Sequence, residues 1–198
     1  VVERKILGSK DYNYLNAKWF KEAVARDSSY WSAPFFDNND QQTPLVSYLI
    51  PIHDRQKRVV AVLGVDLSLE WFSDKLSFYS NTDTHNEYDP YYFVIDSTGT
   101  VLAHPNKNRI VHKKLQDYVT SDPKNRCQEI LAYRANFSNK AEMEIEGVED
   151  FVTYHPVKYT TWTVALVFPK LLMQVVSYLF GGILLFFIAI GILVVTVS

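Results

Sequence analysis

The last 28 residues constrain the fold of this chain more than any other feature. No Asp, Glu, Lys or Arg follows Lys170, and the sequence from there is LLMQVVSYLFGGILLFFIAIGILVVTVS. About 20 consecutive apolar residues are enough for a helix to cross the hydrocarbon core of a bilayer. A soluble fold of 198 residues would not easily enclose so long an apolar helix. We therefore predict a transmembrane helix over residues 171–198, with Lys170 at the outer surface, in an excerpt from a longer membrane protein.

Composition excludes several classes of function. The net charge of −2 leaves no basic surface for nucleic acid. Cys127 is the only cysteine, which excludes an internal disulfide and disfavours a structural zinc site. The five histidines do not fall at metal-ligand spacings, and motifs such as G-x-S-x-G or the P-loop are absent from the sequence. The sequence therefore predicts a protein that is not an enzyme and that carries no metal or cofactor.

The first part of the chain predicts a helix and then a hairpin. Residues 11–26 mix aromatic and polar residues at helical spacing, with Asp11 near the start. Two apolar runs, LVSYLIPI at 45–52 and VVAVLGVDLSL at 59–69, flank the polar segment HDRQK and predict an antiparallel hairpin. The segment SLEWFSDKL then returns to helical spacing.

The pattern restarts after a polar connector at residues 78–90. The segments YYFVI and TVLAH flank the turn DSTG, and a loop with a short helix and a polar stretch follow. The acidic segment EMEIEGVED predicts exposed strand edges and a turn, and two more strands come before the apolar run, DFVTYHPV and TWTVALVF. Each half is thus a small antiparallel sheet with flanking helices, which makes the fold class α+β.

Several phrases of the sequence occur in the order of a known family. They are WSAPFFD, VSYLIPIHD, VVAVLGVDLSLEWF, FVIDSTGTVLAHP and YHPVKYTTWTVALVFPK followed by a membrane helix. In these the chain resembles the double Cache (dCache) sensor domains of bacterial transmembrane receptors. The resemblance implies two PAS-like modules in tandem, a membrane-distal one over residues 1–85 and a membrane-proximal one over 88–168. The family's N-terminal membrane helix, stalk helix and first strand are not in this sequence.

The resemblance also implies a function. A dCache domain is the extracytoplasmic ligand-sensing part of a signal-transduction receptor, and its ligand usually binds the distal module between the sheet and the helix and loop that cover it. For this chain we expect residues 1–170 to lie outside the cell (inner) membrane. We further expect a small-molecule ligand, a homodimer and a signal passed through the transmembrane helix.

Family members that bind amino acids share a residue pattern, and this chain matches it in part. Tyr12 takes the first position, Trp19 and Phe20 the aromatic pair, Phe35 the place of a second Tyr, and Asp37 and Asp66 the two carboxylates. The position of the family's Arg is occupied by Ala17. With two further aromatic residues, the candidate ligand-binding residues are Tyr12, Trp19, Phe20, Trp31, Phe35, Asp37, Tyr48 and Asp66.

These residue types suit an ammonium group. An ammonium that leaves water needs a carboxylate and hydrogen-bond acceptors, and aromatic rings add cation–π attraction. Without a guanidinium at Ala17 there is no bidentate partner for an α-carboxylate. We therefore expect a cationic amine rather than a free amino acid.

Other interpretations of the same residues stay open. The aromatic side chains could be plain core, Asp66 could cap the helix that starts near Ser68, and Asp37 could belong to a solvated loop. At the level of function, the alternatives are a ligand-free dimerisation and spacer module and, with less support, a membrane-anchored extracellular hydrolase.

Overall fold

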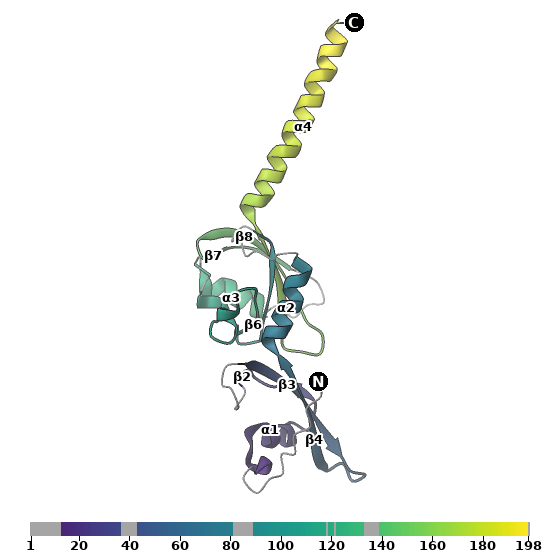
Figure 1. The fold of residues 1–198 in the computed structure, drawn as a ribbon, viewed down its shortest axis with the longest axis vertical. Coiled ribbons are helices and arrows are strands. Elements are labelled where there is room, and N and C mark those ends of the chain that lie inside the picture. Colours follow the sequence, from purple (N-terminus) through teal and green to yellow (C-terminus); the bar gives the residue numbers. More distant parts are fainter. Residues whose placement is uncertain are drawn as a thin grey trace. The chain divides into compact units, whose positions relative to one another are not determined.

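The computed structural model describes residues 13–36, 43–80, 89–117, 119–120, 122–132 and 139–197. They form two antiparallel sheets with helices and a long C-terminal apolar helix, so the predicted α+β fold class is confirmed (Figure 1). The chain divides into two compact units, Val1–Phe72 and Ser73–Ser198. The predicted module limits at residues 85 and 88 lie outside the described residues.

The helical part of the first unit is shorter than the sequence predicts. A single 3-10 turn, η1 (Tyr14–Asn16), comes before helix α1 (Lys18–Arg26). The two are separated by Ala17, whose backbone is extended with φ −64° and ψ 140°. Asn at residue 16 is a poor helix former, which favours an interrupted start. Helix α1 buries Ala23 completely and ends at Asp27, whose backbone is left-handed.

The sheet of the first unit is built around one strand, β3 (Pro44–His53). Strand β4 (Val59–Ser68) pairs with β3 along its whole length, as the predicted hairpin requires. The two-residue strands β1 (Tyr30–Trp31) and β2 (Phe35–Phe36) pair with the other side of β3. In the hairpin turn, the carboxylate of Asp54 accepts hydrogen bonds from the backbone N–H groups of Gln56 and Arg58.

The second unit holds five strands in the order β6-β5-β9-β8-β7. The acidic segment forms the end of β7, a turn and the start of β8, so the expected strands and turn are present there. Helix α3 was not predicted, because its sequence is mostly polar. Helix α2 (Leu69–Ser80) begins in the first unit and continues into the second. The other elements of the second unit before its C-terminal helix are β5 (Tyr91–Ile95), β6 (Val101–Ala103), η2 (Lys107–Arg109), η3 (Leu115–Asp117), α3 (Pro123–Ala132), β7 (Asn139–Ile145), β8 (Val148–Pro156) and β9 (Thr163–Pro169).

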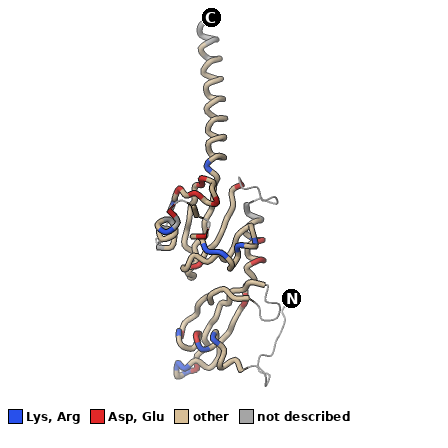
Figure 2. Tube along the Cα trace, turned by 90° about the vertical axis from the view of Figure 1, so that its left-hand side faces the viewer, with Lys and Arg blue, Asp and Glu red and all other residues tan. Residues whose placement is uncertain are grey.

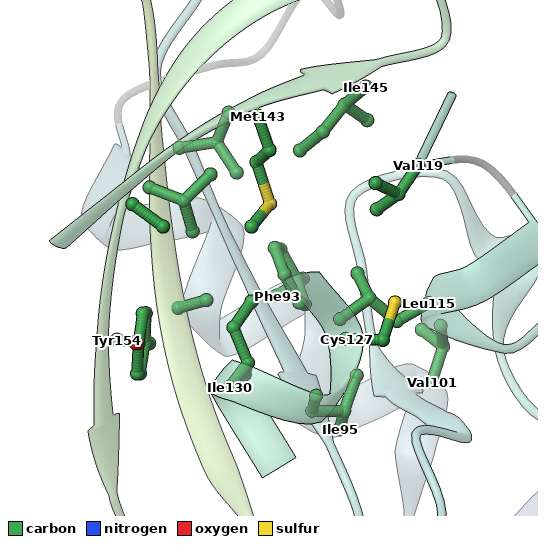
Figure 3. Packing of buried hydrophobic residues seen from close by; sticks show 14 residues of the cluster. Phe93, Ile95, Val101, Leu115, Val119, Cys127, Ile130, Met143, Ile145 and Tyr154 are labelled. Atoms are coloured by element: carbon green, nitrogen blue, oxygen red, sulfur yellow. The ribbon is translucent and has the colours of Figure 1, made fainter. Parts of the chain in front are cut away.

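A hydrophobic core joins one face of this sheet to helix α3. Phe93 from β5 is fully buried and lies among Met143 of β7 and Cys127 and Ile130 of α3 (Figure 3). Cys127 and Ile130 are three residues apart, which places both on the same face of the helix. The other members of the cluster are Ile95, Val101, Leu115, Val119, Ala141, Ile145, Val152, Tyr154, Ala165 and Val167.

Helix α4 (Lys170–Val197) follows β9 without an intervening residue. Lys170 is the one charged residue along its described length (Figure 2). Within Lys170–Ile190, a stretch of 18 residues has a mean hydropathy of 2.2 and is not buried in the protein, so this helix is long and apolar enough to span a membrane. The Lys170 Nζ atom lies 3.1 Å from a carboxylate oxygen of Glu149 and 3.5 Å from one of Glu142.

The turn between β5 and β6 depends on a glycine. Gly99 has φ +80°, a conformation that costs residues with a Cβ atom about 1 kcal/mol. We expect Gly99→Ala to lower the free energy of unfolding by about 1 kcal/mol, and Gly99→Asn by less, because Asn tolerates this region better. Thermal unfolding of the chain in detergent measures both. Equal losses for the two variants would show that backbone conformation is not the cause.

Candidate functional site

Asp66 lies near the end of strand β4, where the hairpin fixes its partner. The residue opposite it on β3 is Ser47, whose Oγ atom donates a hydrogen bond of 2.6 Å to Asp66 Oδ1. The backbone of Ser47 is held in turn by Ser32, through a 2.9 Å bond to the Ser32 Oγ atom and a 2.8 Å bond between the main chains. Asp66 is solvent-exposed, and its Oδ2 atom bonds none of the described residues. An anchored, exposed carboxylate of this kind can accept a further hydrogen bond from a ligand.

The register of the strands determines which side chains share a face with Asp66, because paired residues point the same way and neighbours alternate. Phe35 pairs with Leu45, two residues from Ser47, and so lies on the face of Asp66. Tyr30 lies on this face as well, since it pairs with Leu49, and its hydroxyl donates to the backbone oxygen of Trp19 at 3.4 Å. Helix α1 therefore packs over the same face as Asp66.

Trp31 and Tyr48 lie on the opposite face. They pair with each other across β1 and β3, and their ring centroids are 5.1 Å apart. The hydroxyl of Tyr48 donates to the Ser29 Oγ atom at 3.0 Å. The structure thus brings these two candidates together, but on the other side of the sheet from Asp66.

Trp19 and Phe20 form an aromatic group on helix α1. Their ring centroids are 5.7 Å apart in an edge-to-face arrangement, and the ring of Tyr14 lies 5.4 Å from that of Phe20. All three rings keep some solvent contact. Tyr14 was not among the predicted site residues. Its position in the sequence, five residues before Trp19 and six before Phe20, could have identified it.

Two candidates, Tyr12 and Asp37, lie outside the described residues. That they lie close to Asp66 therefore stays a prediction. The alternative role of Asp66 as a helix cap has a competitor in Ser68, whose Oγ atom accepts the backbone N–H of Trp71 at 3.3 Å. Ser47 is a residue that sequence reasoning missed. It pairs with Asp66 because the hairpin register shifts between Ile52 and His53, which the sequence alone does not show.

The chemistry around this face is that of hydrogen bonds and aromatic contacts. The guanidinium of Arg26 lies 4.5 Å above the ring of Tyr30. Burial, with a smaller contribution from the charge of Glu22, raises the pKa of Tyr30, so its hydroxyl stays protonated and remains a donor. Among the described residues there is no group of three His, Cys, Asp or Glu side chains that could hold a metal ion.

Comparison with solved structures finds this fold in other protein domains. The extracellular domain of a protein described as a histidine kinase, mmHK1S-Z3, superposes with a TM-score of 0.66 at 23% identity, over 84% of this chain and 58% of that one. The ligand-binding domain of the Pseudomonas aeruginosa PAO1 amino acid chemoreceptor PctC, in complex with GABA, gives 0.57 at 22% identity, over 81% and 64%. That of the Pseudomonas fluorescens chemoreceptor CtaA, in complex with L-isoleucine, gives 0.58 at 22% identity, over 82% and 60%.

The chain thus spans roughly three fifths of the length of these solved domains. A comparison with curated proteins found no match. The family model of the Cache domain matches residues 3–173, which is most of the chain and includes both sheets. This chain is a member of the Cache domain family.

Proposed function

We propose that this chain is the extracytoplasmic ligand-sensing part of a bacterial membrane receptor, and that its first unit binds a small cationic amine. The sensing role is supported by the Cache family match and by the similarity to extracellular domains of receptors, two of which hold an amino acid or GABA. Such a domain is a receptor module rather than an enzyme.

The amine is suggested by one observation, the exposed carboxylate of Asp66 with its anchored Oδ1 and open Oδ2 atoms. Phe35 shares its face, and helix α1 brings Trp19 and Phe20 to the same side of the sheet. The Arg position of the family pattern is Ala17, which can supply no partner for a ligand carboxylate. Asp37 and Tyr12 are proposed to complete the site.

Signalling is proposed to run through helix α4 across the inner membrane, in a homodimer with residues 1–170 outside. A ligand can shift the balance between two arrangements only by as much as it binds one of them better. The ion pairs of Lys170 with Glu142 and Glu149 link the sheet of the second unit to the start of this helix.

Calorimetric titration of the chain in nanodiscs tests the proposal. Ethylamine, histamine and choline are the amine probes, with alanine and glutamate as comparators. We expect an amine to bind and Asp66→Asn to weaken it at least tenfold, because a charge-assisted hydrogen bond is lost. The matched control is Asp74→Asn, which removes one carboxylate in the second unit, paired with Lys107 at 2.9 Å, and is expected to leave binding unchanged.

Three outcomes would each contradict a different part of the proposal. Binding of amino acids alone would refute the amine. Equal affinity of the native chain and Asp66→Asn would refute the site. Failure of every probe would favour the alternative of a ligand-free dimerisation and spacer module.

A further inference from the structure

A cavity lies in the second unit, where strand β8 ends and strand β9 begins. It has a volume of about 300 Å³ and is lined by the connection between these strands, by Ser97 of the β5–β6 turn and by Leu131 of α3. This is the lower end of the size range of small-molecule sites. We propose that this cleft binds a small organic monoanion, such as a short carboxylate, independently of the amine proposed for the first unit.

The connection that forms the cleft is held in place by its own hydrogen bonds. The backbone N–H of Val157 donates to the oxygen of Trp162 at 2.9 Å, which closes the loop. Thr160 bridges the loop interior, since its Oγ atom donates to the oxygen of Val157 at 2.8 Å and accepts the N–H of Trp162 at 3.0 Å. Trp162 is only 7% exposed, so it provides a fixed apolar wall. A cleft formed in advance binds a ligand without a large ordering cost.

The charge of the lining selects an anion. Among the described residues that line the cleft, Lys158 is the only Lys, Arg, Asp or Glu. Lys158 forms no ion pair with any described residue, so its ammonium group is open to a ligand. The hydroxyls of Ser97, Thr161 and Thr163 supply further donors. One cation with several neutral donors suits a single negative charge, whereas an amine or zwitterion would bring an ammonium group with no carboxylate to meet it.

Titration of the chain in nanodiscs with propionate, lactate and benzoate tests this site, with ethylamine as the cationic comparator. We expect at least one anion to bind and ethylamine not to compete with it. Lys158→Gln removes the charge, and Ser97→Phe fills the cleft without changing the charge. Each should weaken anion binding at least tenfold. Lys124→Gln, an exposed lysine of α3 outside the lining, is the charge-matched control and should bind like the native chain.

The variants separate this proposal from the amine site. Anion binding that survives in Asp66→Asn supports an independent site, and anion binding lost in Asp66→Asn overturns it. The proposal is also overturned if none of the three anions binds the native chain, or if Lys158→Gln and Ser97→Phe both bind as the native chain does. Failure of the amine titration alone leaves these outcomes unaffected.

Discussion

Replacing Phe93 by alanine is expected to lower the free energy of unfolding of the second unit by about 3–5 kcal/mol. Phe93 is fully buried in the middle of the cluster that joins α3 to the sheet. Its removal forfeits the transfer free energy of the ring and leaves a cavity that the surrounding strands cannot fill. Hydrogen exchange followed by mass spectrometry measures the loss separately for peptides of each unit.

The control for this substitution is Tyr159→Ala, which also removes an aromatic ring. Tyr159 is 96% exposed, so its loss should change stability by no more than about 0.5 kcal/mol. We also expect the peptides of the first unit to keep their protection in Phe93→Ala. A loss below about 1 kcal/mol, or one equal to that of the control, would mean that the cluster is not the core of this unit.

Replacing Asp150 by asparagine is expected to stabilise the chain at pH 8 and to change little at pH 4. Asp150 is a carboxylic acid on β8, paired with Met143 of β7 and Pro169 of β9, and only 5% of its surface is exposed. Burial disfavours the ionised form and raises the pKa of Asp150 from 3.8 to about 7. Asparagine has nearly the same shape and carries no charge at any pH.

The direction of the pH effect follows from the order of the two pKa values. Well below pH 4 the carboxyl is protonated in both the folded and unfolded states, so folding buries no charge. Between about pH 4 and 7 the unfolded state releases its proton while the folded state keeps it, and stability falls as the pH rises. Above about pH 7 the carboxyl is ionised in both states, so the folded protein bears the full cost of burying the charge. Because the protein around a buried carboxylate relaxes when the carboxylate ionises, we expect a loss of about 2 kcal/mol rather than the full value of the shift.

Thermal or denaturant unfolding of both proteins in detergent at pH 4, 6 and 8 measures this difference directly. The quantity to compare is the difference in the free energy of unfolding between the native chain and Asp150→Asn, because all other groups titrate equally in both proteins. A gap that is the same at pH 4 and pH 8, or an asparagine variant that is the less stable protein at pH 8, would contradict the prediction.

The strands of this fold could be predicted from the sequence where apolar residues run together. The hairpin of β3 and β4 and strand β5 were predicted within one or two residues, because their apolar runs end at polar turns. Helix α3 was missed, since its polar residues hide the spacing of Cys127, Ile130 and Leu131, at positions i, i+3 and i+4. That spacing becomes meaningful only when the sheet face that it covers is known.

The candidate site was harder to predict, because sequence order does not show which face a side chain occupies. Trp31 follows Tyr30 directly, and in a two-residue strand these neighbours point to opposite faces of the sheet. Phe35 reaches the face of Asp66 because it pairs with Leu45. The aromatic residues of one continuous stretch are therefore divided between the two sides of β3, according to a register that only the folded chain defines.

The direct joint between β9 and α4 fixes the rotation of helix α4 about its own axis. Pro169 ends the strand and Lys170 begins the helix, so no flexible segment can absorb a twist. Each helical residue turns the side chains by about 100°, so one residue added at the joint would present a different face of the helix to any neighbouring helix. The rotation of the helix about its axis is therefore fixed relative to the β7–β8 hairpin, whose Glu142 and Glu149 form ion pairs with Lys170.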